Sequence, residues 1–419
     1  MKTMRKGFYL VGAWMLTMMF IAVSCSTEDG DETGSYDYEK AEGYSTAYSD
    51  GSEGSPGSDG NGSGDQEGNT EAGIVTAGEW CDLTHWDFWS RLMLGNDFSD
   101  KSSYWEFYTN NRIPVQVTDS NGNGLAGVKV KLLSENEGKT TTIWETMTDN
   151  HGQAECWYGL FQKATADASK LRISLNDDVM DGNPVVCPLD SLSQGVKVNQ
   201  YIYNKAEDVS QQADIAFVVD ATGSMGDEIE FLKSDLKDII NKAKSARPGM
   251  KMRTAALFYR DEGDEYLTRP FNFTDKLSET VNFIDKQQAG GGNDYPEAVH
   301  TALSSMLQDL SWDSKARTRI AFLILDAPAH HETDIIRSLQ QSVQQCAKQG
   351  ICLIPVAASG TDKNTEFMLR FFAATTGGTY VFLTDHSGVG FSHMAASVGN
   401  YEVELLNKLL IRLIEYYTE

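Results

Sequence analysis

Basic residues are scarce in this chain of 419 residues, where 35 Lys and Arg stand against 60 Asp and Glu. The formal net charge is therefore −25 at pH 7. Nucleic-acid binding needs Lys and Arg to displace the counterions of the phosphates, so this balance excludes nucleic acid as an expected partner. It favours metal ions or basic protein surfaces instead.

Cysteine is also rare, with six residues and no Cys-x-x-Cys pair that would indicate a zinc site. We expect Cys346 and Cys352 to be small buried residues in the helix and strand of one crossover. A disulfide between Cys156 and Cys187, or between Cys81 and either of them, is open, because sequence alone does not choose between these pairings.

Motifs of common enzyme classes are absent. There is no Gly-x-Ser-x-Gly nucleophile elbow, and no Gly-Lys-Ser or Gly-Lys-Thr follows the glycines at 290–292, as a phosphate-binding loop requires. The run His330-His331-Glu332 does not have the His-Glu-x-x-His spacing of metalloproteases, so we expect it at a loop edge rather than in a transition-metal or acid–base site. We predict no catalytic residue and no enzyme activity.

The N-terminus combines basic residues with an apolar run. Lys2, Arg5 and Lys6 precede the apolar residues 8–23. This order is typical of a secretory signal, residues 1–24, that is removed on maturation. The small residues before Cys25 resemble the lipobox of bacterial lipoproteins, which implies a lipid on the Cys25 thiol and attachment to a membrane. An ordinary signal peptide or a short membrane anchor is the alternative.

Residues 25–76 are mostly Gly, Ser, Asp and Glu. Between residues 26 and 75 there are thirteen acidic residues and one lysine. Such a segment cannot bury enough apolar surface to offset its ordering entropy, so we expect an extended acidic tether. Its acidic run at 28–32 is similar to export signals of surface-exposed lipoproteins in Gram-negative bacteria, which implies the outer membrane or cell surface. A spacer facing the periplasm is the alternative.

Residues 77–208 alternate short β-type runs with turns. The expected strands cover 112–118, 128–133, 141–147, 154–158 and 171–175, and Asn and Gly mark turns at 119–124 and 149–152. We predict an antiparallel β-sandwich, which resembles bacterial immunoglobulin-like and carboxypeptidase-regulatory-like domains. We expect it to hold the second domain away from the membrane.

Aromatic residues cluster ahead of these strands. They are Trp80, Trp86, Phe88, Trp89, Tyr104, Trp105 and Phe107. We expect them to pack in the core or between domains, and a carbohydrate-stacking platform is the alternative.

Residues 209–419 alternate strands with helices, which predicts an α/β domain with a doubly wound, mostly parallel sheet. The expected central strands cover 215–219, 254–259, 320–325 and 351–357, with a short last strand at 379–383. Apolar residues at helical spacing predict a helix over 229–243. Further helices are expected over 275–286, 296–310, 334–348, 366–375 and 393–417.

Three loops at the carboxyl ends of these strands carry oxygen ligands, over residues 220–228, 290–297 and 326–331. In an open parallel sheet, ligands bind outside these strand ends, so the loops are expected to converge. Asp220, Thr222 and Ser224 alternate in the first loop, and Asp326 ends the strand before the third. Neutral and acidic oxygens together suit Mg²⁺, Mn²⁺ or Ca²⁺ rather than zinc.

These three loops resemble those of a von Willebrand factor type A (VWA) domain. Such domains carry a metal-ion-dependent adhesion site with a first loop of the form Asp-x-Ser-x-Ser, and Thr222 replaces the middle serine here. The second loop is similar to that of integrin β subunits, which implies Glu297 rather than Asp294 as its ligand. The resemblance implies a metal site formed by Asp220, Thr222, Ser224, Glu297 and Asp326.

Additional ions are also implied by the integrin β subunit. Asp227 and Glu228 keep the spacing of a site adjacent to the first, although acidic residues also favour the first turn of a helix. Asp261 and Asp294 could join Glu297 at a third ion, but Gly292 stands where that family has an asparagine ligand.

The expected function is that of a lipid-anchored surface protein that binds a protein or matrix ligand. A divalent cation would keep an open position, which an Asp or Glu carboxylate of the ligand completes. The alternative is a structural or assembly factor of a cell-envelope complex that uses the same metal site.

Overall fold

The computed structural model describes residues 75–95, 98–189, 195–205, 209–292, 294–384 and 395–419. The predicted signal peptide, Cys25 and the acidic tether up to residue 74 lie outside these residues. No helix in the described part of the chain is long and apolar enough to cross a membrane.

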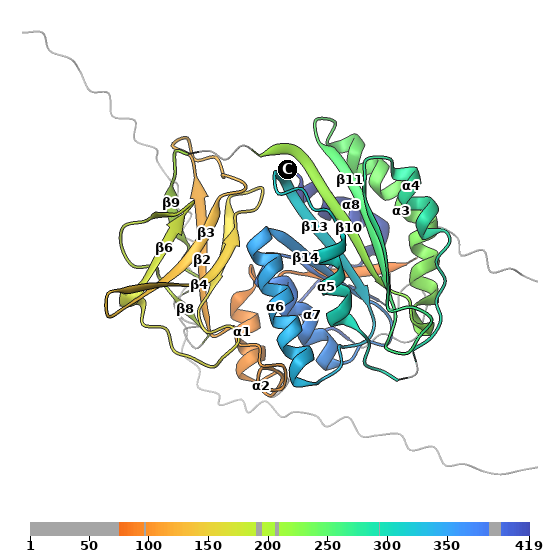
Figure 1. Ribbon diagram of the computed structural model, residues 1–419, viewed down its shortest axis with the longest axis horizontal. Helices are drawn as coiled ribbons and strands as arrows, with labels where there is room; N and C mark the ends of the chain where they lie inside the picture. Colours follow the sequence, from red (N-terminus) through yellow and green to blue (C-terminus); the bar gives the residue numbers. More distant parts are fainter. Residues whose placement is uncertain (1–74, 96–97, 190–194, 206–208, 293, 385–394) are drawn as a thin grey trace, which may run out of the picture. The chain divides into compact units, whose positions relative to one another are not determined.

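The larger sheet has eight strands in the order β12-β11-β10-β13-β14-β15-β1-β16 (Figure 1). Their bounds are Thr268–Thr274 (β12), Lys251–Tyr259 (β11), Ser210–Asp220 (β10), Ala316–Leu325 (β13), Ile351–Ala357 (β14), Tyr380–Leu383 (β15), Thr76–Trp80 (β1) and Glu404–Leu405 (β16). The strands from β11 to β15 are parallel to one another, whereas β12 and β1 are antiparallel to their neighbours. The prediction of a mostly parallel sheet is confirmed.

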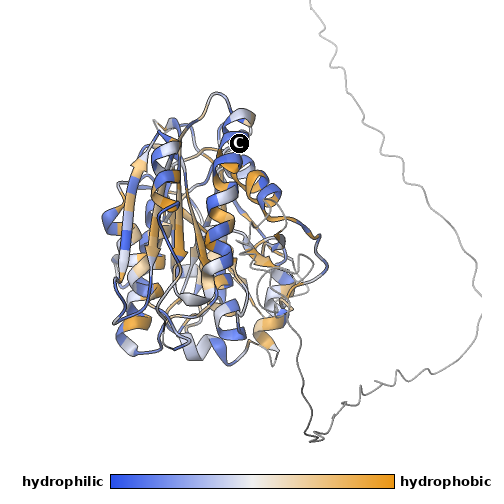
Figure 2. Cartoon of the chain, turned by 90° about the vertical axis from the view of Figure 1, so that its right-hand side faces the viewer, coloured by the Kyte–Doolittle hydropathy of each residue, from blue (hydrophilic) through white to orange (hydrophobic). Residues whose placement is uncertain are grey.

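Helices cover both faces of this sheet. They are Gly226–Ala246 (α3), Leu277–Ile284 (α4), Val299–Asp309 (α5), Thr333–Gln349 (α6), Lys363–Thr376 (α7) and Leu406–Tyr417 (α8). Buried residues of α5, α6 and α7 form one core cluster, and those of α3, α4 and α8 form the other. Strand residues alternate between the clusters, and Figure 2 shows the apolar strands lying between the helices. Burial on both faces explains the continuous apolar runs of β10 and β13.

The smaller domain consists of two four-stranded sheets. One contains Gln153–Trp157 (β5), Asn111–Thr118 (β2), Cys187–Pro188 (β8) and Asn199–Ile202 (β9), and the other contains Lys139–Met147 (β4), Lys129–Asn136 (β3), Leu171–Leu175 (β6) and Asp178–Val179 (β7). All five predicted strands are present. The sheets are antiparallel except that β9 pairs with β2 in parallel. Apolar residues of both sheets, such as Val117 and Ile173, belong to the same core cluster as the buried residues of α5, α6 and α7.

The first residues of the predicted sandwich belong elsewhere, which corrects the boundary at residue 77. Strand β1 lies within the larger sheet, between β15 and β16. After β1 the chain forms the helices Trp86–Leu94 (α1) and Lys101–Trp105 (α2), then the sandwich, and returns to the sheet as β10. The sandwich is therefore an insertion between two strands of the larger sheet, and it does not separate the sheet from the N-terminal segment as we expected.

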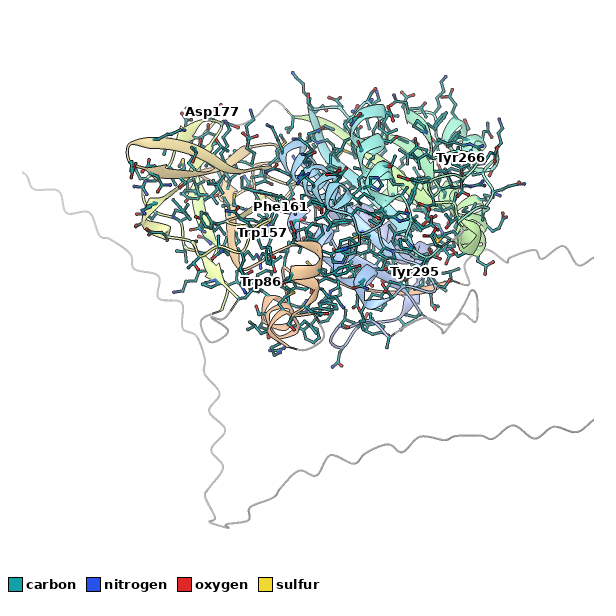
Figure 3. All side chains as sticks on the ribbon, turned by 60° about the horizontal axis from the view of Figure 1, so that its bottom comes forward. Trp86, Trp157, Phe161, Asp177, Tyr266 and Tyr295 are labelled. Atoms are coloured by element: carbon teal, nitrogen blue, oxygen red, sulfur yellow. The ribbon has the colours of Figure 1, made fainter. Side chains whose placement is uncertain are left out.

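Side-chain packing explains why residues 76–107 join the larger domain. Trp89 stacks on Phe367 of α7 with ring centroids 6.1 Å apart, and Phe107 stacks on Phe371 at 4.2 Å. The Arg370 side chain, fully buried in α7, donates from Nε to Asp82 Oδ2 at 2.9 Å. The predicted aromatic cluster thus packs between elements, as Trp86 and Trp157 also do (Figure 3).

The five described cysteines are all free thiols. Cys156 lies opposite Ile113, and Cys187 lies opposite Arg112 on the other side of β2. The two cysteines are therefore two strand spacings apart, together roughly 9–10 Å. This distance exceeds the limit of about 7 Å between the Cα atoms of a disulfide. Cys346 in α6 and Cys352 in β14 occupy one crossover, as predicted.

Two sequence predictions missed parts of the larger domain. Strand β12 was not expected, because its polar and half-buried residues at the sheet edge do not form an apolar run. The last helix, predicted over 393–417, begins at Leu406. Residues 393 and 394 of that prediction lie outside the described part.

Candidate metal site

The first loop follows β10 and leads into α3. Asp220 and Thr222 are buried, whereas Ser224 is exposed. Asp220 Oδ1 accepts hydrogen bonds from the backbone amide of Thr222 at 2.9 Å and from its hydroxyl at 2.8 Å. Asp220 Oδ2 is buried and accepts no hydrogen bond of normal geometry from the described residues, although the buried Tyr259 hydroxyl lies near enough to lower the pKa of Asp220. The turn thus fixes one carboxylate oxygen and leaves the other unsatisfied.

The second loop approaches the first through its glycines. The amide of Gly290 donates to Ala221 O at 3.0 Å. At Gly292 φ is +69°, and a Cβ atom there would lie 2.8 Å from Glu297 Oε1 and 2.9 Å from Thr222 Cβ. Backbone therefore fills the space between Thr222 and Glu297, which a residue other than glycine would disturb.

The third loop brings Asp326 to the same edge of the sheet. Asp326 follows β13 directly and is 6% exposed, and Glu297 is 4% exposed. The amide of Glu297 donates to Pro328 O at 2.9 Å, which joins the second and third loops. The Oε2 atom of Glu297 is buried without a partner among the described residues. The structure therefore places the five residues that we predicted to hold a metal ion on neighbouring loops at the carboxyl ends of the strands.

The three carboxylates of this site are short of positive charge. Burial raises the pKa of Asp220 to about 7, and the neighbouring Asp326 carboxylate adds to this rise. Burial raises the pKa of Glu297 to about 9, with Asp220 and Asp261 adding to it. Burial also raises the pKa of Asp326, which the Ser224 hydroxyl partly offsets. None of the main causes of these shifts is a Lys or Arg side chain.

The four residues predicted for additional ions differ in position. Asp294 is exposed, and so is Asp227 in the first turn of α3. Glu228 is buried, and its Oε1 accepts a hydrogen bond from the Ser359 hydroxyl at 3.0 Å. Asp261 is buried and lies 2.7 Å from His330 Nε2. Asp261 therefore has a partner within the protein, whereas the other carboxylate oxygen of Glu228, Oε2, is buried without a partner among the described residues.

Asp264 is a residue of this edge that the sequence reasoning missed. Its Oδ2 accepts hydrogen bonds from the amides of Asp261 at 3.2 Å and Gly292 at 3.0 Å. It therefore connects the loop after β11 to the second loop. The acidic run at 261–265, directly after a buried strand, was the signal that could have identified it.

Tyr295 is a second missed residue, and Figure 3 labels it on the larger domain. Its hydroxyl donates to Asp326 O at 3.3 Å and accepts from the amide of Asp362 at 3.0 Å. Asp362 caps the N-terminus of α7 through the Thr365 amide. Tyr295 thus ties the second loop to the third loop and to α7.

The adjacent histidines of the third loop are held by different partners. His330 bonds to Asp261, whereas His331 stacks on Tyr104 with ring centroids 3.6 Å apart. His331 Nε2 also lies 2.6 Å from Tyr104 O. The two side chains thus lie at the loop edge.

The residues present fit a divalent cation with oxygen ligands. Within the described part of the chain, no group of three or more His, Cys, Asp or Glu side chains is placed to hold a metal ion. The hydroxyls of Thr222 and Ser224 would therefore have to complete a ligand set with the carboxylates. Three buried carboxylate oxygens of the predicted residues, on Asp220, Glu228 and Glu297, have no hydrogen-bond partner among the described residues, and carboxylate oxygens are the donors that Mg²⁺, Mn²⁺ or Ca²⁺ prefers.

Residues 214–390 match the family model of the von Willebrand factor A domain. The chain is 32% identical over 121 residues to an ariadne-like RING finger protein of Acanthamoeba polyphaga mimivirus, and 32% identical over 127 residues to the alpha-protein kinase vwkA of Dictyostelium discoideum. These matches cover 29% and 30% of this chain, but 12% and 20% of the relatives.

Two solved structures show partial similarity. The pilus adhesin SpaC of Lactobacillus rhamnosus GG is 11% identical, with a TM-score of 0.36, and the match covers 51% of this chain and 32% of that one. A von Willebrand factor type A protein of Catenulispora acidiphila is 12% identical, with a TM-score of 0.35, and the match covers 74% of this chain and 50% of that one.

Proposed function

We propose that this chain, which carries a von Willebrand factor A domain at residues 214–390, is a non-enzymatic binding protein that captures a protein ligand through a divalent cation. The observation that supports this most is the cluster of buried Asp220, Glu297 and Asp326, which has no cationic partner and contains two unsatisfied oxygens. Such a cluster is unfavourable in isolation, because buried charges need compensation.

Asp220, Thr222, Ser224, Glu297 and Asp326 would hold the ion, which we propose to be Mg²⁺, with Mn²⁺ or Ca²⁺ as alternatives. When bound, the cation supplies positive charge and an open position for an Asp or Glu carboxylate of the partner. The chain's own residues keep the ligands in place. Gly292 allows the close approach of Thr222 and Glu297, and exposed Ser224 lies at the protein surface, where a partner can reach it.

We further propose that the protein acts at the cell surface or outer membrane of a Gram-negative bacterium, attached by a lipid on Cys25. The apolar run before Cys25 and the acidic run at 28–32 support this location. A VWA domain supports a protein-binding role there, and adhesion is the biological form we favour.

The test is cation-dependent binding by the wild type and by Asp220→Ala. Calorimetric titration with Mg²⁺ or Mn²⁺ should detect binding to the wild type and none to the variant. Asp238→Ala, an exposed change on α3, is the matched control and should titrate like the wild type. Wild-type affinity in Asp220→Ala would refute the metal assignment.

The protein ligand can be sought by pull-down from cell-envelope extracts with and without a chelator. We expect the chelator to release the captured partner. Capture that is indifferent to the chelator would contradict the metal-bridged mechanism. The identity of the partner separates adhesion from an assembly role within an envelope complex.

A further inference from the structure

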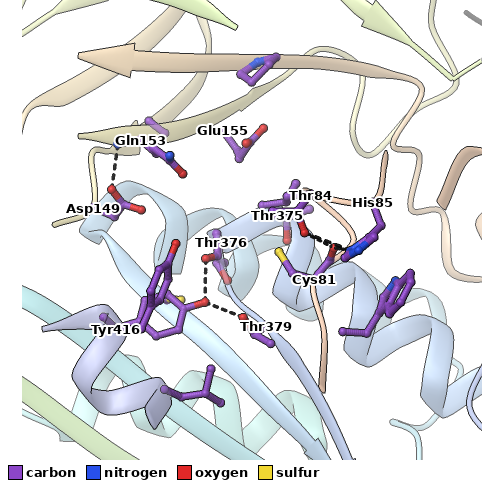
Figure 4. A pocket seen from close by; sticks show the side chains of 18 of the residues that line it. Cys81, Thr84, His85, Asp149, Gln153, Glu155, Thr375, Thr376, Thr379 and Tyr416 are labelled. Carbon is purple, nitrogen blue, oxygen red and sulfur yellow. Dashed lines mark hydrogen bonds between the residues drawn. The ribbon is translucent and has the colours of Figure 1, made fainter. Parts of the chain in front are cut away.

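A cavity of about 1100 Å³ lies between the sandwich and the larger domain (Figure 4). Its walls are residues of the segment after β1, of strands β2 and β5, and of the ends of α7 and α8. Trp80, the last residue of the antiparallel strand β1, lines it, as does Cys352 near the start of β14. The cavity therefore lies near the amino ends of the parallel strands, whereas the candidate metal site lies at their carboxyl ends.

The cationic residues that line the cavity are neutralised by the protein itself. Arg112 donates from Nε and Nη2 to the two carboxylate oxygens of Glu155, at 2.8 and 2.7 Å. Arg412 donates to Glu79 at 2.9 Å and also bonds to Glu404. Neither arginine is available for a phosphate, sulfate or carboxylate, so an anionic ligand would not find a free cation here.

Polar groups without a partner among the described residues, in contrast, are available for a ligand. The side-chain amide of Gln153 on β5 has no hydrogen bond with the described residues and lies beside the cavity (Figure 4). The Tyr416 side chain is 47% exposed, and its hydroxyl is likewise unpaired within the described part. One carboxylate oxygen of Asp149 accepts hydrogen bonds from the backbone amides of His151 and Gln153, at 2.9 and 2.8 Å. Its other oxygen accepts none from the described residues.

Aromatic faces border the same space. Trp80 and His85 both line the cavity and stack with ring centroids 4.0 Å apart, and because Trp80 is 7% exposed, the exposed ring of this pair is that of His85. Tyr401, 41% exposed, and Tyr416 add two further rings. Flat apolar faces next to amide, hydroxyl and carboxylate groups match a ligand that has both apolar ring faces and many hydroxyl groups.

We propose that this cavity binds a neutral oligosaccharide. Its volume slightly exceeds the usual range of small-molecule sites, about 300–1,000 Å³, which favours several sugar rings over one. Gln153 and Asp149 would bond to sugar hydroxyls, and Tyr416 would stack on a ring face. This site is independent of the proposed metal site, because the two sites lie at opposite ends of the parallel strands.

The experiment is to apply the full chain to an array of neutral oligosaccharides of glucose, xylose, mannose, galactose and N-acetylglucosamine, with sulfated glycans alongside. The strongest binder is then titrated by calorimetry. We expect binding to neutral glycans, none to sulfated ones, and no effect of a chelator. Gln153→Ala and Tyr416→Ala should each weaken binding about tenfold or more, equivalent to about 1.4 kcal/mol.

Two further variants control for folding and for the type of contact. Gln345→Ala, an exposed glutamine on α6 outside the cavity, should bind like the wild type. Tyr416→Phe keeps the ring and should retain most of the affinity that Tyr416→Ala loses. Absence of binding to every neutral glycan, or binding of a polyamine such as spermine that Gln153→Ala abolishes, would overturn the proposal.

Discussion

Replacing Asp220 by asparagine should stabilise the metal-free protein and remove its response to divalent cations. Asparagine has the shape of aspartate and can still accept the two hydrogen bonds from Thr222. It does not carry the buried charge that lies beside Asp326 and Glu297. The variant therefore isolates the free energy of one uncompensated carboxylate.

The magnitude follows from the pKa of Asp220, which burial raises from its ordinary 3.8 to about 7. One pKa unit corresponds to about 1.4 kcal/mol, so the shift represents roughly 4 kcal/mol at most. A carboxyl group with a raised folded-state pKa favours folding most at low pH, and this contribution is lost as the pH rises through about 7. The stability of Asp220→Asn should therefore exceed that of the wild type by an amount that grows between pH 5 and pH 8.

The assay is urea unfolding in chelator at pH 5 and pH 8, repeated at pH 8 with excess Mg²⁺. At a concentration of 100 times its Kd, the cation should add about 2.7 kcal/mol to the wild type, and nothing to Asp220→Asn. Cation affinity of the wild type should also rise with pH, because binding displaces protons from Asp220 and Glu297. If Asp220→Asn is less stable than the wild type in chelator at pH 8, the carboxylate is not an uncompensated charge.

Three other substitutions test separate parts of the structure. Gly292→Ala should weaken Mg²⁺ binding at least tenfold in calorimetry, whereas Gly263→Ala, also at positive φ but with no atom near its added Cβ, should leave the affinity unchanged. Asp82→Ala should lower the free energy of unfolding, measured in urea, by about 3–5 kcal/mol, because it leaves Arg370 buried without its main partner. As a control, Asp87→Ala removes an exposed ion pair and should change the free energy of unfolding little. Cys25→Ser should move the protein from the membrane to the soluble fraction on cell fractionation, and continued membrane attachment would contradict the lipid anchor.

Periodicity in the sequence predicted most of the larger domain because both faces of its sheet are buried. Long apolar runs such as those of β10 and β13 identify central strands without any knowledge of their neighbours in the sheet. Strand β12 has no such run, since its residues are half-buried or exposed at the edge. Strand β1 is only five residues long, and its place beside β15 depends on partners about 300 residues away. Local pattern carries no information about such a distant pairing.

The residues of the candidate site were predictable where their own positions in the sequence indicated them. Asp220 and Asp326 could be placed because each lies at the carboxyl end of a buried strand in a parallel sheet. The roles of Asp264 and Tyr295 could not be predicted, although the acidic run at 261–265 marks the position of Asp264, because both act through hydrogen bonds to backbone groups of other loops. Such contacts depend on how loops fold over one another, which residue spacing does not specify.

The place of β1 has a mechanical consequence. Because β1 runs antiparallel to β15, Thr76 lies at the sheet edge where Asp220 and Asp326 also lie. A pull on the segment that precedes residue 75 would load the β1 hydrogen-bond ladders with β15 and β16 in shear. The load would reach the loops of the candidate metal site through the sheet, because the sandwich is inserted after β1 and lies outside this path.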